Sequence, residues 1–225
     1  MKTELAQSFR RLEYRPPVYT FDQVELDIAL DPARTIVKSK IEVLPGKSFE
    51  PGAPLVLLGQ ELEFVSLRIN GEAHRHFELT PETLTIHSLP QEGREKFVVE
   101  IISICVPEKN TSLMGLYVSN GNFFTQCEAE GFRKITYFLD RPDVMARYRV
   151  TLRAQESECP VLLSNGNLLN EEKLPNGWHS ATWEDPFPKP SYLFALVAGK
   201  LERIEEMRGK DLPADWDGIH RATSK

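Results

Sequence analysis

The chain has 225 residues, with 27 lysines and arginines against 33 aspartates and glutamates, and a formal net charge of −6. A chain of this length can bury roughly 70% of the surface that its unfolded form exposes, so its core needs no disulfide or metal. Acidic and basic residues are mixed along the whole length, which argues against the clustered basic face of a nucleic-acid-binding protein.

The sequence predicts neither an export signal nor a membrane partner. Residues 1–17 lack the apolar segment of a secretory signal, and no apolar run approaches the ~20 residues that span a bilayer. Cys105, Cys127 and Cys159 are odd in number, widely spaced and without a C-x-x-C pair. We therefore expect three free thiols and a cytoplasmic location.

Apolar and polar residues alternate over most of the chain, which is the pattern of half-buried β-strands. Residues 21–31 (FDQVELDIALD) and 35–45 (TIVKSKIEVLP) predict a hairpin joined by a short turn. Residues 95–106 (EKFVVEIISICV) are nearly all apolar, which predicts a central strand. Further strands are expected in LEFVSLRINGE (62–72), TLTIHSLP (83–90), ARYRVTLRAQ (146–155), PVLLSNGNLL (160–169), GWHSATWED (177–185) and PSYLFALVAGKL (190–201).

Strands at this spacing, separated by Pro, Gly and Asn, predict a mainly β fold, either an antiparallel sandwich or one large twisted sheet. Asn-Gly pairs at 70–71 and 165–166 are strong tight-turn signals. Helix is scarce, with candidates only in residues 4–13 (ELAQSFRRLE) and one turn in 142–148 (PDVMARY). Residues 208–225 lose the alternation and are expected to be poorly structured.

Two patterns invite a catalytic interpretation, and each has a simpler one. His74, His76 and Glu78 would share one face of an extended segment and could bind a metal, but they follow a tight turn in a polar stretch. A solvated strand end is therefore favoured. Cys127 could act as a nucleophile, but no neighbouring residue supplies a base, so a packed structural thiol is favoured.

Other charged patterns favour structural roles. Asp140, Arg141 and Asp143 in LDRPDV (139–144) predict a turn with an ion pair, and the alternating arginines of residues 147–153 predict the solvated face of a strand. The sequence contains no H-E-x-x-H, no G-x-S-x-G, no P-loop and no G-x-G-x-x-G. We therefore assign no catalytic residue and no metal ligand to this chain.

Residues 125–134 (TQCEAEGFRK) raise a different possibility. In an extended segment Gln126 and Glu128 would share one face, with Thr125 and Cys127 on the other. A carboxylate beside an amide, with no base or metal ligand next to them, is suited to holding a ligand rather than reacting with it. From the local pattern alone, an exposed polar strand face remains the favoured interpretation.

Three segments closely resemble bacterial aminopeptidase N, the zinc-dependent aminopeptidase family of the gluzincin type. They are residues 115–144 (GLYVSNGNFFTQCEAEGFRKITYFLDRPDV), 162–167 (LLSNGN) and 183–199 (WEDPFPKPSYLFALVAG). The resemblance covers roughly residues 14–202. It implies that residues 1–202 are the N-terminal domain of such an enzyme, a large saddle-like β-structure packed against a thermolysin-like catalytic domain. Residues 203–225 would be a poorly structured or truncated tail.

The resemblance also implies roles for two residues. Glu128 matches the family's glutamate that pairs with the free α-ammonium of a peptide substrate, and Gln126 matches a glutamine lining the same pocket. The family's zinc motif and G-x-M-E-N motif are absent from these 225 residues and would lie beyond them. Zinc is thus expected in the full-length enzyme and not in this chain, which should not hydrolyse peptides alone even with added zinc.

Two further hypotheses stay open. A stand-alone β-sandwich binding module would keep the domain's surface without catalysis, and its unusually apolar face would favour self-association. A self-contained hydrolase using Cys127 or the His74, His76 and Glu78 group is the weakest hypothesis. The end of the chain is compatible with a natural truncation, a shifted reading frame or an expression boundary.

Overall fold

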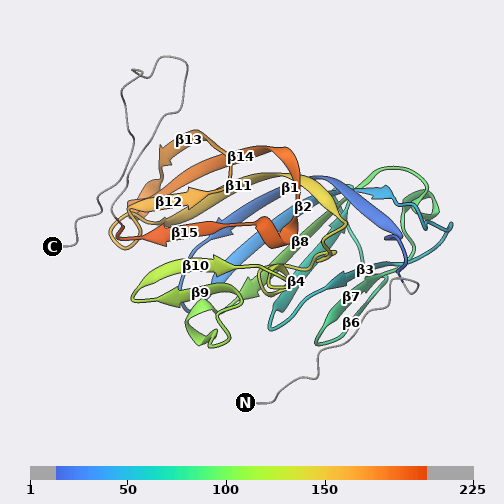
Figure 1. Cartoon of the computed structure of the whole chain (residues 1–225), viewed down its shortest axis with the longest axis horizontal. Coiled ribbons are helices and arrows are strands. Elements are labelled where there is room, and N and C mark those ends of the chain that lie inside the picture. Colours follow the sequence, from blue (N-terminus) through green and yellow to red (C-terminus); the bar gives the residue numbers. More distant parts are fainter. Residues whose placement is uncertain (1–13, 202–225) are drawn as a thin grey trace.

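In a computed structural model of the protein, residues 14–201 are described and form three β-sheets around one hydrophobic core (Figure 1). The largest sheet has eight strands in the order β13-β14-β11-β1-β2-β8-β4-β5. Figure 1 shows the four-stranded sheet in front of this long sheet and the three-stranded sheet at the lower right, and the expected mainly β fold is confirmed. The strands of the long sheet are β1 (Tyr19–Ala29), β2 (Thr35–Pro45), β4 (Glu63–Ile69), β5 (Glu72–Ala73), β8 (Phe97–Cys105), β11 (Met145–Gln155), β13 (Asn167–Lys173) and β14 (Trp178–Pro190).

The alternation in the sequence places one face of this sheet in the core. On β1 the side chains of Val24, Leu26 and Ile28 are buried, whereas the residues between them are half-exposed. β2 follows β1 as the predicted antiparallel hairpin, and β8 lies inside the sheet between β2 and β4. One pairing departs from a purely antiparallel arrangement, because β1 and β11 run parallel.

The two smaller sheets cover the apolar face of the large one and complete the core. Four strands, in the order β12-β15-β10-β9, form one of them, and three strands, in the order β3-β7-β6, form the other. Their strands are β3 (Leu55–Leu58), β6 (Phe77–Leu79), β7 (Thr83–Ile86), β9 (Gly115–Ser119), β10 (Asn122–Gln126), β12 (Val161–Ser164) and β15 (Leu196–Gly199).

Helix within the described range is limited to short 3₁₀ turns, in agreement with the sequence. These are η2 (Pro90–Gly93), η3 (Pro107–Lys109), η4 (Phe132–Lys134), η5 (Pro175–Gly177) and η6 (Ser191–Leu193). The helical turn expected in residues 142–148 is wrong: β11 begins at Met145, where every second side chain is buried in the large sheet. The strand expected over 190–201 is shorter than predicted, because η6 interrupts it before β15.

Two expectations lie outside the described residues: the helix in 4–13 and the tail of 203–225. Within residues 14–201, no helix is long and apolar enough to cross a membrane. The arginines of β11 have the predicted solvated position, and each pairs with a carboxylate: Arg147 with Asp22, Arg149 with Glu184 and Arg153 with Asp27.

Candidate functional site

The segment 125–134 forms a turn, and not the continuous strand that the sequence suggested. β10 ends at Gln126, and the chain then turns so that the Gly131 backbone N–H donates to the Cys127 carbonyl at 2.8 Å. Gln126 and Glu128 are still neighbours, because Gln126 Nε2 donates to the Glu128 carbonyl oxygen at 3.1 Å. The peptide bond between Glu128 and Ala129 is cis. Both predicted site residues are exposed to solvent.

Two buried side chains explain why the chain turns here. Cys127 is 2% exposed and Phe132 is fully buried, so the segment is fixed to the core at both ends. Phe132 packs edge-on against Phe138 and Phe194, with ring centroids 4.6 and 5.1 Å away. The residues between the two anchors, from Glu128 to Glu130, project into solvent.

A buried carboxylate lies beneath this turn. Asp140 Oδ2 accepts hydrogen bonds from the backbone N–H and from Nε of Arg133, both at 3.1 Å. The ion pair predicted in residues 139–144 is present, since Arg141 pairs with Asp143 at 2.7 Å, whereas Asp140 pairs with Arg133. Nothing in the sequence signals this pairing, because the two residues are seven positions apart and no regular element joins them.

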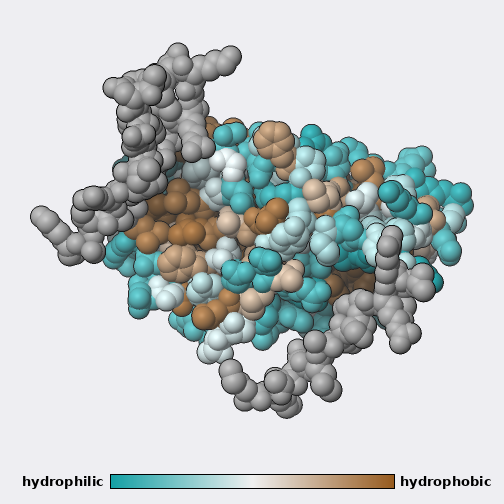
Figure 2. All heavy atoms as spheres, viewed as in Figure 1, coloured by the Kyte–Doolittle hydropathy of each residue, from teal (hydrophilic) through white to brown (hydrophobic). Residues whose placement is uncertain are grey.

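The turn lies at the rim of an apolar surface. In register across the four-stranded sheet, Leu163 is opposite Val197, Val197 is opposite Phe124, and Phe124 is opposite Tyr117. These four side chains are half-buried and point away from the core, since their strand neighbours point into it. Figure 2 shows hydrophobic surface gathered over β12, β15 and β10. We call these four residues the outer row; Gln126 is on the same face.

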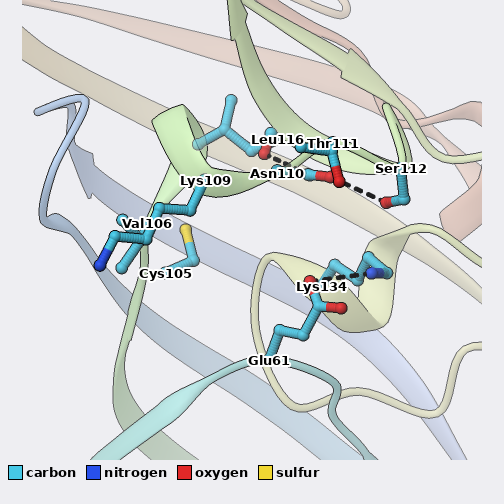
Figure 3. Close-up of a pocket in the computed structure, with 9 residues that line it drawn as sticks. All are labelled: Glu61, Cys105, Val106, Lys109, Asn110, Thr111, Ser112, Leu116 and Lys134. Atoms are coloured by element: carbon cyan, nitrogen blue, oxygen red, sulfur yellow. Dashed lines mark hydrogen bonds and ion pairs between the residues drawn. The ribbon is translucent and has the colours of Figure 1, made fainter.

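A cleft of about 320 Å³ is lined by Lys134, the last residue of the segment 125–134, and by residues 109–112, which precede β9 (Figure 3). Its polar groups largely satisfy one another: Lys134 Nζ pairs with Glu61 at 3.0 Å, and Asn110 donates to the carbonyls of Met114 and Leu116. Cys105 lines it with a buried thiol, and burial raises the pKa of that thiol to about 12. Burial therefore disfavours a reactive thiolate in this cleft.

The alternative catalytic candidates are not supported by their surroundings. Burial, and to a smaller extent the Asp140 charge, raises the pKa of Cys127 far above its usual range, which disfavours the nucleophilic thiolate. All three cysteines are free, as predicted, and all three are buried. His74 Nε2 is hydrogen-bonded to the carbonyl oxygens of His76 and His87. Among the described residues no group of three or more potential ligands could hold a metal ion.

Comparison with known proteins identifies the class to which this fold and turn belong. Residues 20–193 match the Peptidase M1 N-terminal domain, and the chain belongs to that family. It is 43% identical to the aminopeptidase N of Haemophilus influenzae over 204 residues, which are 90% of this chain and 23% of that protein. It is 45% identical to the aminopeptidase N of Caulobacter vibrioides over 208 residues, again 23% of the relative.

Solved structures agree with this assignment. Legionella pneumophila aminopeptidase A, determined in complex with aspartic acid, superposes with a TM-score of 0.78 at 39% identity and covers 85% of this chain and 22% of its own. An M1 zinc metallopeptidase from Deinococcus radiodurans shares the fold, with a TM-score of 0.72 at 20% identity. The chain spans about a quarter of the length of the aminopeptidases N that it matches.

Proposed function

We propose that this chain is the N-terminal domain of a zinc aminopeptidase and that Glu128 binds the α-ammonium group of peptide substrates there. Gln126 would line the same pocket. One observation carries the proposal. An exposed turn of this M1 N-terminal domain presents the Glu128 carboxylate, and no basic side chain among the described residues pairs with it. An exopeptidase must recognise a charged amine, and a carboxylate does so through a charge-assisted hydrogen bond.

The exposure of Glu128 explains why a second domain would be needed. An ion pair between solvated groups contributes only about 0–1 kcal/mol. The same pair is stronger where a second surface excludes water and lowers the local dielectric constant. The outer row, next to Gln126, is suited to contact such a surface, which would come from the catalytic domain. Holding the amine would then fix the scissile peptide bond one residue away.

The catalytic zinc has no place on the described part of this chain. Residues 14–201 offer no cluster of ligands, and the sequence carries no H-E-x-x-H. We therefore assign to this chain the binding of the substrate's amino end, and to the catalytic domain both the metal and the hydrolysis. The three free, buried thiols support a cytoplasmic location for the enzyme.

The proposal is tested in a chimera in which this chain replaces the segment that it matches in H. influenzae aminopeptidase N. Glu128→Ala should lower kcat/KM for an aminoacyl anilide by at least about tenfold, because hydrogen bonds to charged groups contribute about 1.5–3 kcal/mol. Bound zinc, measured by atomic absorption, should stay unchanged. Steady-state kinetics of the chimera and its variant give the comparison.

The matched control is Glu171→Ala, which removes an exposed carboxylate from β13, in the large sheet, and should leave kcat/KM unchanged. A Glu128 variant with the kinetics of the parent chimera would refute the proposed role. A variant that loses zinc would show instead that Glu128 supports the metal site.

A stand-alone binding module is the second candidate function, and the outer row favours it. Half-buried apolar side chains in one line across a sheet are suited to contact another protein. This function predicts association of the 225-residue chain with a partner that has no peptidase activity, whereas the domain hypothesis predicts activity only when a catalytic domain is joined.

A further inference from the structure

The buried carboxylate beneath the turn is not used by the proposed function. The Asp140 side chain is 0% exposed, and the Arg133 side chain that pairs with it is 11% exposed. Arg133 makes three hydrogen bonds to Asp140: its backbone N–H and Nε donate to Oδ2, and Nη2 donates to the Asp140 carbonyl oxygen at 3.1 Å. Ser191 Oγ donates to the remaining carboxylate oxygen, Oδ1, at 2.5 Å.

We propose that Asp140 is a positioning residue, which acts through Arg133 to hold the turn that presents Glu128. This inference rests on the proposed role of Glu128 in binding the substrate amine. Arg133 is in η4, which directly follows the turn. Its Nη2 also pairs with Glu130 Oε1 at 3.2 Å, two residues beyond Glu128. Asp140 therefore reaches the exposed part of the turn through one guanidinium group.

The other contacts of the turn fix its two ends and the Glu128 carbonyl group, so the Glu130 side chain is held by Arg133 and, through it, by Asp140. Cys127 and Phe132 anchor the two ends by burial, and the Gly131 N–H closes the turn onto the Cys127 carbonyl. Of the residues between these anchors, Glu130 is held by Arg133 and Glu128 by the Gln126 amide. Without the Asp140 carboxylate, the backbone N–H and Nε of Arg133 would both lose their acceptor, and only the Nη2 hydrogen bond to the main-chain carbonyl of residue 140 would remain. The guanidinium group would then lose its fixed direction towards Glu130.

The geometry of the pair suits positioning better than stabilisation. A buried ion pair contributes little net stability, because removing both charges from water offsets their attraction. Its fixed donors and acceptors instead select one arrangement of the backbone. The two hydrogen bonds on Oδ2 come from Arg133, which follows the turn, and the single hydrogen bond on Oδ1 comes from Ser191 in η6. The two oxygens can therefore be tested separately.

The experiment measures amide hydrogen exchange by NMR in the intact 225-residue chain. Asp140→Ala should raise the exchange rates of the Gly131 and Lys134 amides at least about tenfold relative to those of Val150 and Leu152 in β11. Ser191→Ala, which removes a hydrogen bond from the other oxygen, should not change this ratio. Asp140→Asn should restore it, since the amide oxygen can accept from Arg133 while the NH₂ group donates to Ser191 Oγ.

A purely structural role gives a different result. If Asp140→Ala accelerates exchange in β11 as much as in the turn, or if Asp140→Asn does not restore the ratio, the proposal is wrong. Should the alanine variant not fold, Arg133→Lys can be measured instead. It keeps a positive charge but removes the forked guanidinium group, and it should raise the same ratio of exchange rates between the turn and β11. These readouts need no substrate, so failure of the Glu128 kinetics in the chimera would be distinguishable from failure here.

Discussion

At the scale of single residues, the turn depends on the absence of a side chain at Gly131. Its backbone is in the ordinary right-handed region, with φ −85° and ψ −19°, so conformational freedom is not the reason for glycine. A Cβ atom at this position would lie 2.3 Å from the Gln126 carbonyl oxygen and 2.8 Å from the Gly115 backbone nitrogen. Neither is the end of a flexible side chain that could move aside.

We therefore expect Gly131→Ala to lower the free energy of unfolding by about 2–3 kcal/mol, the cost of overpacking against backbone. Urea denaturation measures the change. Gly121→Ala is the control, because a Cβ there meets nothing within 4 Å, and only the positive φ of Gly121 costs energy, about 1 kcal/mol. Equal losses in the two variants would mean that the turn moves easily to admit a methyl group.

At the scale of elements, a side chain extends the pairing between β10 and β15. The backbone register joins only Phe123 to Ala198 and Phe124 to Val197. Beyond them, Thr125 Oγ1 accepts from the Leu196 N–H at 2.8 Å and donates to the Leu196 carbonyl at 3.2 Å. The hydroxyl thus satisfies both backbone groups of Leu196 at the point where β10 leads into the turn.

Thr125→Val keeps the shape of this side chain and removes both hydrogen bonds. It should lower the free energy of unfolding by about 1–3 kcal/mol, because the Leu196 N–H and carbonyl lose their partners in a half-buried place. Thr125→Ser keeps the hydroxyl and loses one methyl group, so about 0.8 kcal/mol is expected. Chemical denaturation ranks the two, and a serine variant as unstable as the valine variant would contradict the argument.

Most of the strands that the sequence predicted well alternate between apolar and polar residues over a long stretch. β11 alternates over its whole length and β2 over all but its last residue, and β1 does so on each side of a β-bulge between Phe21 and Val24. A shift of one residue in such a strand would turn its buried side chains into solvent. Segments 125–134 and 190–201 alternate only briefly, and buried anchors such as Phe132 and Phe194 redirect them. Those anchors depend on packing partners far away in the sequence, which no local pattern contains.

The candidate site, like the elements, was predictable from the sequence only in part. Gln126 and Glu128 were found through a resemblance to a family, and the local argument for their shared face was wrong, because a turn and one side-chain hydrogen bond hold them together. Arg133, Asp140 and Ser191 come from three segments that meet only in the folded chain. Pairwise contacts of this kind follow from topology, and the sequence pattern predicts only that the sheets exist.

At the scale of the whole molecule, the outer row is the surface that we expect to govern association of the chain in solution. Leu163, Val197, Phe124 and Tyr117 lie in register on the outward face of the four-stranded sheet, where Figure 2 shows hydrophobic surface. In the proposed enzyme the catalytic domain would cover this face. In the chain alone a second copy is the available partner, because an apolar row is self-complementary about a two-fold axis.

We therefore expect the 225-residue chain to self-associate as its concentration rises, and Val197→Lys to shift it to monomer by placing a charge in the middle of the row. Light scattering after size exclusion measures the mass across a dilution series. Val65→Lys makes the same chemical change on β4, where Val65 is 47% exposed, and should leave association unchanged. A wild-type chain that stays monomeric at the highest attainable concentration would show that the row is too narrow to bind a second copy. If both lysine variants lower the measured mass equally, the added net charge would be responsible, and the contact between copies would not lie on the outer row.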